Sequence, residues 1–307
     1  MRTADRSEGH PARMRGNRFG FWFFRLLIRV LGLRVAYSFL YIVCAYYLLF
    51  DPSAVSAAAP YVARRFPESG RLKRHLHIYR LFISQGKQLI DRSAILHQND
   101  LFDLKLKGHE EFVELLENRE SGLILLTAHV GNWQLALSSL GEMKRDVYLL
   151  MRPEHNVAVN TSLRVRREEK GIKIISAEDN IGGALQVMNV LAEGHIVSIM
   201  GDRSYGFDTV EVPFLGDTAR FPFSAFVIAA AAKCPVAVLL SAKVSEYGYL
   251  IDVSHILYPK YKSARGKRGQ IASWVRNYAA ILQDYIDDYP YQCFLFFDIW
   301  GDDERIE

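Results

Sequence analysis

Residues 123–134 read LILLTAHVGNWQ. The first five form a short apolar run typical of a strand buried on both faces of a parallel sheet. A helical pattern then opens at Gln134, so His129 lies just past the strand end and beside a helix N-terminus. Functional groups of open α/β sheets gather at this carboxyl edge. His129 is therefore a candidate for acid–base chemistry.

The same alternation of short apolar runs and helical stretches continues on the C-terminal side. Such a pattern predicts an α/β fold, with a mostly parallel central sheet flanked by helices. Further strands are expected at 147–151, 172–176, 195–200, 235–244 and 249–257. Helices are expected at 61–96, 110–117, 134–141, 157–170, 181–193, 222–233 and 269–288.

The N-terminal region differs from the rest in charge and hydropathy. The whole chain has a net charge of +4, yet residues 1–34 alone contain eight arginines against two acidic residues. The 16 residues of Val35–Phe50 carry no charge. Arg25, Arg29 and Arg34 lie among large apolar and aromatic residues just before this run.

Four interpretations of this region stay open: a cleaved signal peptide, a transmembrane helix, an interfacial anchor, and a helix of the protein core. A membrane-anchoring helix is favoured, because arginine side chains can reach lipid phosphates while the aromatic residues enter the acyl boundary. The preceding arginines would place the protein on the cytoplasmic side of the membrane. We therefore divide the chain into a basic segment and membrane anchor, 1–59, and a folded domain, 60–307.

Composition and motifs exclude several classes of protein. Half of the residues are hydrophobic, and the three cysteines are far apart and form no CxxC pair, so neither disorder nor a metal or disulfide scaffold is indicated. GxSxG, P-loop, GxGxxG and HExxH signatures are absent. The basic clusters lack the interleaved aromatic residues of nucleic-acid modules. We predict no metal, no cofactor and no nucleic-acid partner.

Several residues near the predicted strand ends are candidates for substrate contacts. Gly131 would permit a close approach of backbone or ligand, and Asn132 could support the His129 loop or cap the helix that follows. Arg152 directly follows a predicted strand, where its guanidinium could contact a phosphate or an oxyanion. Arg167 belongs to a basic stretch of the predicted helix 157–170, one side of which could face the site.

The motif TAHVGNWQ resembles the His-x4-acid motif of the lysophospholipid acyltransferase superfamily, in particular its lipid A biosynthesis late acyltransferase branch. The likeness continues in the expected order through Asp91-Arg92, Met151–Asn156, Arg167–Gly171, Gly194–Asp202 and Val212–Gly216. It implies transfer of a fatty acyl group from an acyl carrier protein to a lipid or glycolipid acceptor at the cytoplasmic face of the inner membrane. The acceptor would offer a hydroxyl or an amine, and a lipid A precursor is the example that the resemblance suggests.

Two departures from the family pattern bear on the mechanism. Gln134 stands where the family has its acid, and the C-terminal block reads PYQCFLFFDIW from Pro290 to Trp300. An amide can hold the tautomer of His129 but brings no charge to stabilise the imidazolium. Three possibilities follow for the role of the missing acid. Another carboxylate takes its place, or the enzyme is slow, or the protein no longer catalyses the reaction. Asp202 is the best substitute, because it follows a neighbouring strand and would reach the same sheet edge.

We therefore predict a membrane-associated acyltransferase in which His129 is the general base, with Gln134 and Asp202 as its catalytic partners. Alternatives are a degenerate member that binds acyl chains or regulates envelope-lipid synthesis, and a thioesterase-like hydrolase. Acyl carrier proteins are acidic, so one of two basic clusters, at 64–80 or at 260–268, could steer the donor.

Overall fold

The structure is a computed structural model that describes residues 18–95, 101–139, 145–151, 172–176, 180–203, 208–263 and 265–301. The helices are α1 (Arg18–Phe50), α2 (Pro52–Arg65), α3 (Arg71–Ile95), α4 (His109–Glu117), α5 (Trp133–Ser139), α7 (Asn180–Ala192), α8 (Ser224–Ala232) and α9 (Lys267–Asp288). The strands are β1 (Asp103–Lys107), β2 (Leu123–Thr127), β3 (Val147–Met151), β4 (Ile172–Ser176), β5 (Ile196–Met200), β6 (Thr209–Phe214), β7 (Asp217–Pro222), β8 (Val236–Lys243) and β9 (Gly248–Leu257).

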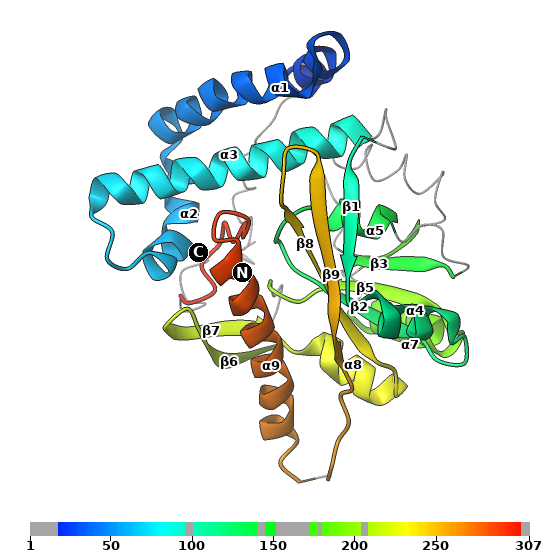
Figure 1. Cartoon of the computed structure of the whole chain (residues 1–307). Coiled ribbons are helices and arrows are strands. Elements are labelled where there is room, and N and C mark those ends of the chain that lie inside the picture. Colours follow the sequence, from blue (N-terminus) through cyan, green and yellow to red (C-terminus); the bar gives the residue numbers. More distant parts are fainter. Residues whose placement is uncertain are drawn as a thin grey trace, which may run out of the picture.

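A seven-stranded sheet in the order β1-β9-β8-β2-β5-β3-β4 forms the centre of the fold (Figure 1). Strands β8, β2, β5, β3 and β4 run parallel, whereas β9 is antiparallel to β8 and pairs in parallel with β1. Helices flank this sheet, so the predicted α/β class with a mostly parallel sheet is confirmed. The hairpin of β6 and β7 forms a separate two-stranded sheet.

Both faces of the sheet are covered by packed residues. Successive side chains of a strand point to opposite faces, so a strand that is buried throughout packs on both sides. In β2, Ile124 and Leu126 join the larger core cluster, which also takes residues from α1–α3 and α7–α9. Leu123 and Leu125 join the smaller cluster, together with residues of α4 and α5. The apolar run that predicted this strand is therefore explained by burial from two sides.

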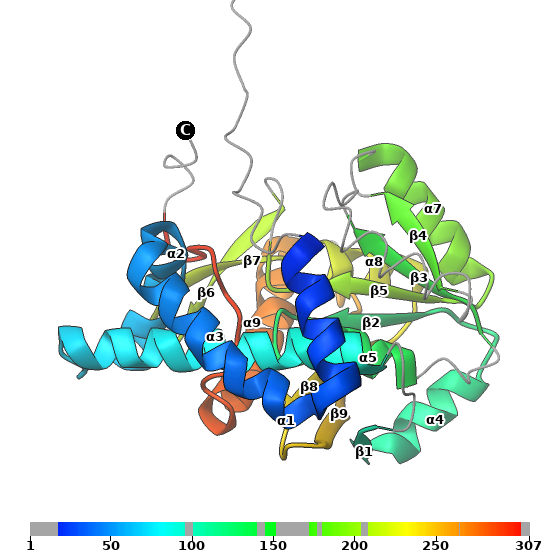
Figure 2. The same ribbon diagram turned by 90° about the horizontal axis from the view of Figure 1, so that it is seen from above.

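Helix α1 is bent and largely uncovered. Gly32 has the left-handed φ of 82° and divides it into two segments. Among the described residues, one helical stretch, Trp22–Phe50, is sufficiently long and apolar to cross a membrane. Only 28% of its most apolar window is buried inside the protein. Figures 1 and 2 show α1 lying across α3 on the outside of the molecule. Large apolar side chains point away from the protein, among them Trp22, Val30, Ile42, Leu49 and Phe50.

The prediction of a single helix over residues 61–96 is wrong. Two helices occupy this region, because α2 ends at Arg65 and α3 begins at Arg71. Pro67 and Gly70 lie in the break, and both residues disfavour a continuous helix. Helix α2 begins earlier than expected, with Pro52 in its first turn and an Asp51 side chain that accepts a 2.9 Å hydrogen bond from the Ala54 N–H. The domain boundary after residue 59 stays a prediction.

Other elements agree with the prediction or lie outside it. The bounds of β2, β3 and β4 are those expected from the sequence. Strand β1 and the β6–β7 hairpin were not predicted. The predicted helix 157–170 falls outside the described residues.

A buried ionic cluster fastens α1 to the sheet. Asp91 of α3 is fully buried, and one of its oxygens lies 2.7 Å from Lys243 Nζ at the end of β8. The hydroxyls of Tyr37 in α1 and Tyr249 in β9 also donate to the Asp91 carboxylate. Burial raises the pKa of Asp91 and lowers that of Lys243, since both charges lose water, while each charge opposes the shift of the other.

We expect Lys243→Met to destabilise the fold by about 3–5 kcal/mol, because it leaves a buried carboxylate without its cation. Adding Asp91→Asn should restore part of this loss, since the amide keeps a hydrogen-bond acceptor for the tyrosines without a buried charge. Denaturant unfolding of both single variants and the double variant measures the coupling free energy. Strictly additive losses would contradict the pairing of these residues.

Candidate active site

His129 and Asp202 form a hydrogen-bonded pair beyond the ends of β2 and β5. The Nδ1 atom of His129 lies 3.0 Å from Asp202 Oδ1 and 3.1 Å from Oδ2. The backbone N–H of His129 donates to Oδ2 at 2.7 Å. Asp202 is fully buried, whereas the His129 side chain is 30% exposed. A buried carboxylate thus holds an imidazole that is itself partly exposed.

The parallel register of the two strands brings this pair together. Thr127 at the end of β2 is opposite Met200 at the end of β5. The Gly201 N–H extends the pairing by donating to the Thr127 carbonyl at 2.8 Å, and the Tyr278 hydroxyl donates to the same oxygen at 3.0 Å. His129 lies two residues after Thr127, and Asp202 lies two residues after Met200. The two side chains therefore meet at one edge of the sheet, as the sequence predicts.

The carboxylate also fixes the chemistry of the ring. An ionised carboxylate only accepts hydrogen bonds, so Nδ1 carries a proton and the neutral ring has its lone pair on Nε2. Burial lowers the pKa of His129, but the charge of Asp202 and its hydrogen bond raise it more, and the net direction is upward. The positive charge of Arg203 lowers the pKa of His129. The pair can therefore take a proton at Nε2 and stabilise the imidazolium that results.

Asp202→Asn should lower the pKa of His129, because it removes the charge that favours the imidazolium while burial stays. NMR titration of the imidazole in the full chain measures this change against wild type. Arg203→Gln is the matched control with the opposite sign, since losing the arginine should raise the pKa further. A pKa that does not move in Asp202→Asn would contradict the role of Asp202.

Gly131 is required by a close approach of the protein backbone. Its φ is +51°, and a Cβ atom there would lie 1.5 Å from the carbonyl oxygen of Ser241 in β8. The sequence analysis allowed a close approach of Gly131 to either backbone or ligand, and the structure shows the approach to backbone. A contact between Gly131 and substrate stays a prediction.

Gly131→Ala should therefore destabilise the fold and displace the His129 loop, because neither the clash nor the left-handed φ can be relieved locally. We expect a loss of more than about 2 kcal/mol in unfolding free energy. Gly216→Ala is the control: Gly216 also has a positive φ, but a Cβ atom added there would meet nothing within 4 Å. Equal losses in the two variants would show that backbone strain alone explains the effect.

Asn132 caps the short helix α5. Its Oδ1 accepts a hydrogen bond from the Leu135 N–H at 3.3 Å, and its Nδ2 donates to the Gln88 carbonyl in α3 at 3.4 Å. The side chain is buried. Asn132 thus serves both roles considered from the sequence, as a helix cap and as a support for the loop, and its proposed substrate contact stays a prediction.

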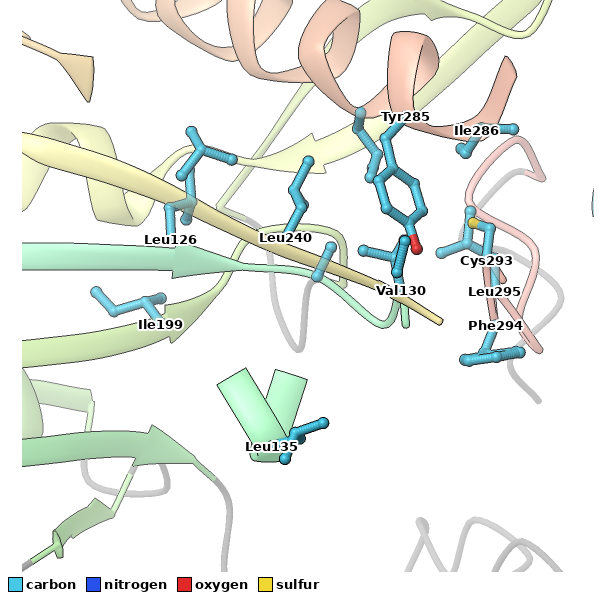
Figure 3. Packing of buried hydrophobic residues seen from close by; sticks show 14 of the residues in the cluster. Leu126, Val130, Leu135, Ile199, Leu240, Tyr285, Ile286, Cys293, Phe294 and Leu295 are labelled. Carbon is cyan, nitrogen blue, oxygen red and sulfur yellow. The ribbon is translucent and has the colours of Figure 1, made fainter. Parts of the chain in front are cut away.

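The C-terminal segment holds the other side of the His129 loop. The Phe294 N–H donates to the His129 carbonyl at 2.7 Å, and the Gly131 N–H donates to the Gln292 carbonyl at 2.8 Å. Between these bonds, Val130 and Cys293 form an antiparallel bridge. Figure 3 shows Val130 facing Tyr285 of α9 and the apolar residues of this segment. The divergent C-terminal block therefore supports the loop.

The aromatic ring of Phe297 contacts both His129 and a cation. The Phe297 ring meets the imidazole edge to face, with 6.2 Å between the centroids, and the Arg203 guanidinium lies 4.8 Å from the centre of Phe297. Sequence analysis missed Phe297 and Arg203 as neighbours of the site. The position of Arg203 directly after Asp202 was the available signal.

The remaining predicted residues are placed in part. Gln134 is buried in the first turn of α5, and the carboxylate at His129 Nδ1 comes from Asp202. A catalytic role for Gln134 stays a prediction. Arg152 and Arg167 lie outside the described residues. Within the part of the chain that the structure describes, His, Cys, Asp and Glu residues form no group of three that could hold a metal ion.

The fold and this pair define an α/β protein with a hydrogen-bonded histidine and aspartate at the carboxyl edge of its sheet. Residues 83–300 match the family of bacterial lipid A biosynthesis acyltransferases. The chain belongs to this family, since the match covers well over half of its length and includes both His129 and Asp202. The resemblance seen in the sequence is thereby confirmed. A comparison with curated proteins finds no match.

Proposed function

We propose that this chain is a membrane-associated acyltransferase that moves a fatty acyl group from an acyl-carrier-protein thioester to a lipid or glycolipid acceptor such as a lipid A precursor. Family membership supports acyl transfer of the lipid A type. The observation that carries the mechanism is the contact of the partly exposed His129 with the buried Asp202 at the sheet edge.

In this mechanism His129 is the general base. Nε2 takes the proton of the acceptor hydroxyl, or of an amine, while the acceptor atom attacks the thioester carbonyl. The tetrahedral intermediate collapses, the carbon–sulfur bond breaks, and the thiolate of the donor leaves. The imidazolium then returns its proton to this thiolate, so the histidine ends in its starting state. One acyl group has moved and no cofactor is consumed.

Asp202 replaces the acid that the family motif places where this chain has Gln134. Its carboxylate holds the tautomer with the Nε2 lone pair and compensates the positive charge that develops on the ring. Because Asp202 is fully buried, water weakens this electrostatic effect little. This arrangement favours turnover over the alternative of a degenerate member without catalysis.

The membrane is the expected source of the acceptor. Most of the apolar window of α1 is uncovered, and basic residues of the N-terminal region precede it in the sequence. Such a helix supports attachment to the cytoplasmic face of the inner membrane, where positive residues are retained. Lipid acceptors would then reach His129 without leaving the bilayer surface.

The donor would dock on the α2–α3 side. The cluster 260–268 follows β9, which runs antiparallel to β8, and therefore lies toward the edge of the sheet away from His129. In the other cluster, Arg64 and Arg65 already pair with Asp217 and Asp287. This leaves the exposed start of α3, with Arg71, Lys73 and Arg74, as the surface for an acidic carrier protein.

Acyl-transfer assays on membranes that contain the full chain test the mechanism with labelled acyl-carrier protein as donor. His129→Ala should reduce transfer by about 10²–10⁴-fold, since it removes the general base. Asp202→Asn should reduce transfer more than Gln134→Ala does. The acid limb of the pH–rate profile should also move to lower pH in Asp202→Asn, because the pKa of the base falls.

Other outcomes would select the alternatives. Release of free fatty acid instead of labelled lipid would identify a thioesterase-like hydrolase. Bound acyl chains without turnover, unchanged in His129→Ala, would identify a degenerate member. Equal activity of wild type and Asp202→Asn would remove Asp202 from the mechanism and return the orienting role to Gln134.

A further inference from the structure

A cavity of about 810 Å³ lies between α1, α3 and the turn that joins β8 to β9. Neither His129 nor Asp202 lines it. Its two helical walls are formed by residues spaced three or four apart, so one face of each helix points into it. The volume is that of a small-molecule site, which typically measures about 300–1,000 Å³.

The lining of this cavity is strongly cationic. Four basic side chains contribute to it, Arg34, Arg80, Lys87 and Lys243, against the single carboxylate of Glu246. Arg34 pairs with Glu246 at 2.8 Å, and Lys243 pairs with the buried Asp91 at 2.7 Å. These two contacts neutralise half of the basic groups.

Lys87 and Arg80 keep their charge for a ligand. Lys87 Nζ lies 5.2 and 5.5 Å from the ring centres of Tyr37 and Tyr41, and Arg80 contacts the ring and hydroxyl of Tyr291. Among the described residues, neither cation has a carboxylate within 4 Å. The aromatic contacts position two cations at one cavity without neutralising them.

The chemistry of this lining selects a phosphate-bearing ligand. An ammonium and a guanidinium together offer several charge-assisted hydrogen bonds to phosphate oxygens. Exposed apolar side chains stand at the rim, since Leu76 is 47% and Tyr41 42% exposed. A soluble phosphate would leave this apolar rim unused, whereas a lipid would bury it.

The position of α1 identifies the membrane as the source. This helix forms one wall of the cavity, and Ile42, Leu49 and Phe50 are exposed further along the same helix. Figure 2 shows α1 crossing over α3, and residues of both helices line the cavity. A headgroup inside the cavity could keep its acyl chains against α1.

We propose that this cavity is a site for the phosphorylated headgroup of a membrane lipid, separate from the transfer site at His129, with Lys87 and Arg80 as its phosphate contacts. The inference rests on the membrane association in the proposed function but not on catalysis. It assigns a second lipid contact to the chain, on the same side of the protein as its apolar helix.

Binding of short-chain lipids to the full chain in neutral detergent tests this site. Dihexanoyl phosphatidic acid, dihexanoyl phosphatidylcholine and inorganic phosphate are titrated separately by calorimetry. We expect phosphatidic acid to bind at least about tenfold more tightly than the other two probes, and the Lys87→Gln/Arg80→Gln double variant to lose about tenfold or more of this affinity. Lys87→Arg should retain binding, because it keeps the charge.

The control is the double variant Lys105→Gln/Arg276→Gln, which removes the same two charges from exposed positions in β1 and α9. It should bind phosphatidic acid like wild type, and thermal unfolding of all variants checks the fold. Equal affinity for both lipids, equal loss in the control variant, or equally tight binding of inorganic phosphate would overturn the proposal. A loss of carrier-protein docking without loss of lipid binding in the Lys87/Arg80 variant would assign these cations to the donor instead.

His129→Ala separates this site from the proposed function. The variant should lose acyl transfer and retain phosphatidic acid binding. If wild type bound the lipid without transferring an acyl group, the transfer mechanism would fail while the headgroup site stood.

Discussion

The alignment of β2 with β5 is the constraint on which the candidate site depends. Parallel pairing places Thr127 opposite Met200. Two residues beyond this pair, β2 leads to His129 and β5 leads to Asp202. His129 and Asp202 are consequently neighbours although they are 73 residues apart in sequence. A shift of one residue in either strand would turn the carboxylate to the other face of the sheet. The fully buried β2 prevents this shift, because both of its faces pack into the core.

A second constraint comes from the C-terminal segment. Gln292 accepts at its carbonyl from the Gly131 N–H, while its side chain bonds to the backbone of Lys243 and to the Gln88 side chain. One residue thereby joins the His129 loop, the end of β8 and α3. The loop is held on one side by Asp202 and on the other by this segment. Rigid support of this kind would keep the proposed general base in a productive position.

Sequence alone predicted the parts of this structure that follow from local patterns. Short apolar runs gave the central strands their bounds, and Asp202 could be predicted because it follows such a run. β1 was missed, since DLKLK carries three charges and its strand conformation depends on pairing with β9. Gln292 and Phe297 were also missed, because they lie in a segment without periodicity whose position is decided by long-range contacts. The break between α2 and α3 was indicated by Pro67 and Gly70, but the basic helical pattern on both sides obscured it.

The topology also links the apolar helix α1 to the edge of the sheet that carries the His129–Asp202 pair. β8 runs parallel to β2, so Lys243 at its end emerges at the same edge of the sheet as His129. Lys243 reaches Asp91 there, and the hydroxyl of Tyr37 fastens α1 to that carboxylate. The apolar helix is therefore anchored to the edge that carries the base. In the proposed function, an acceptor held along α1 would therefore lie toward the same edge of the sheet as His129.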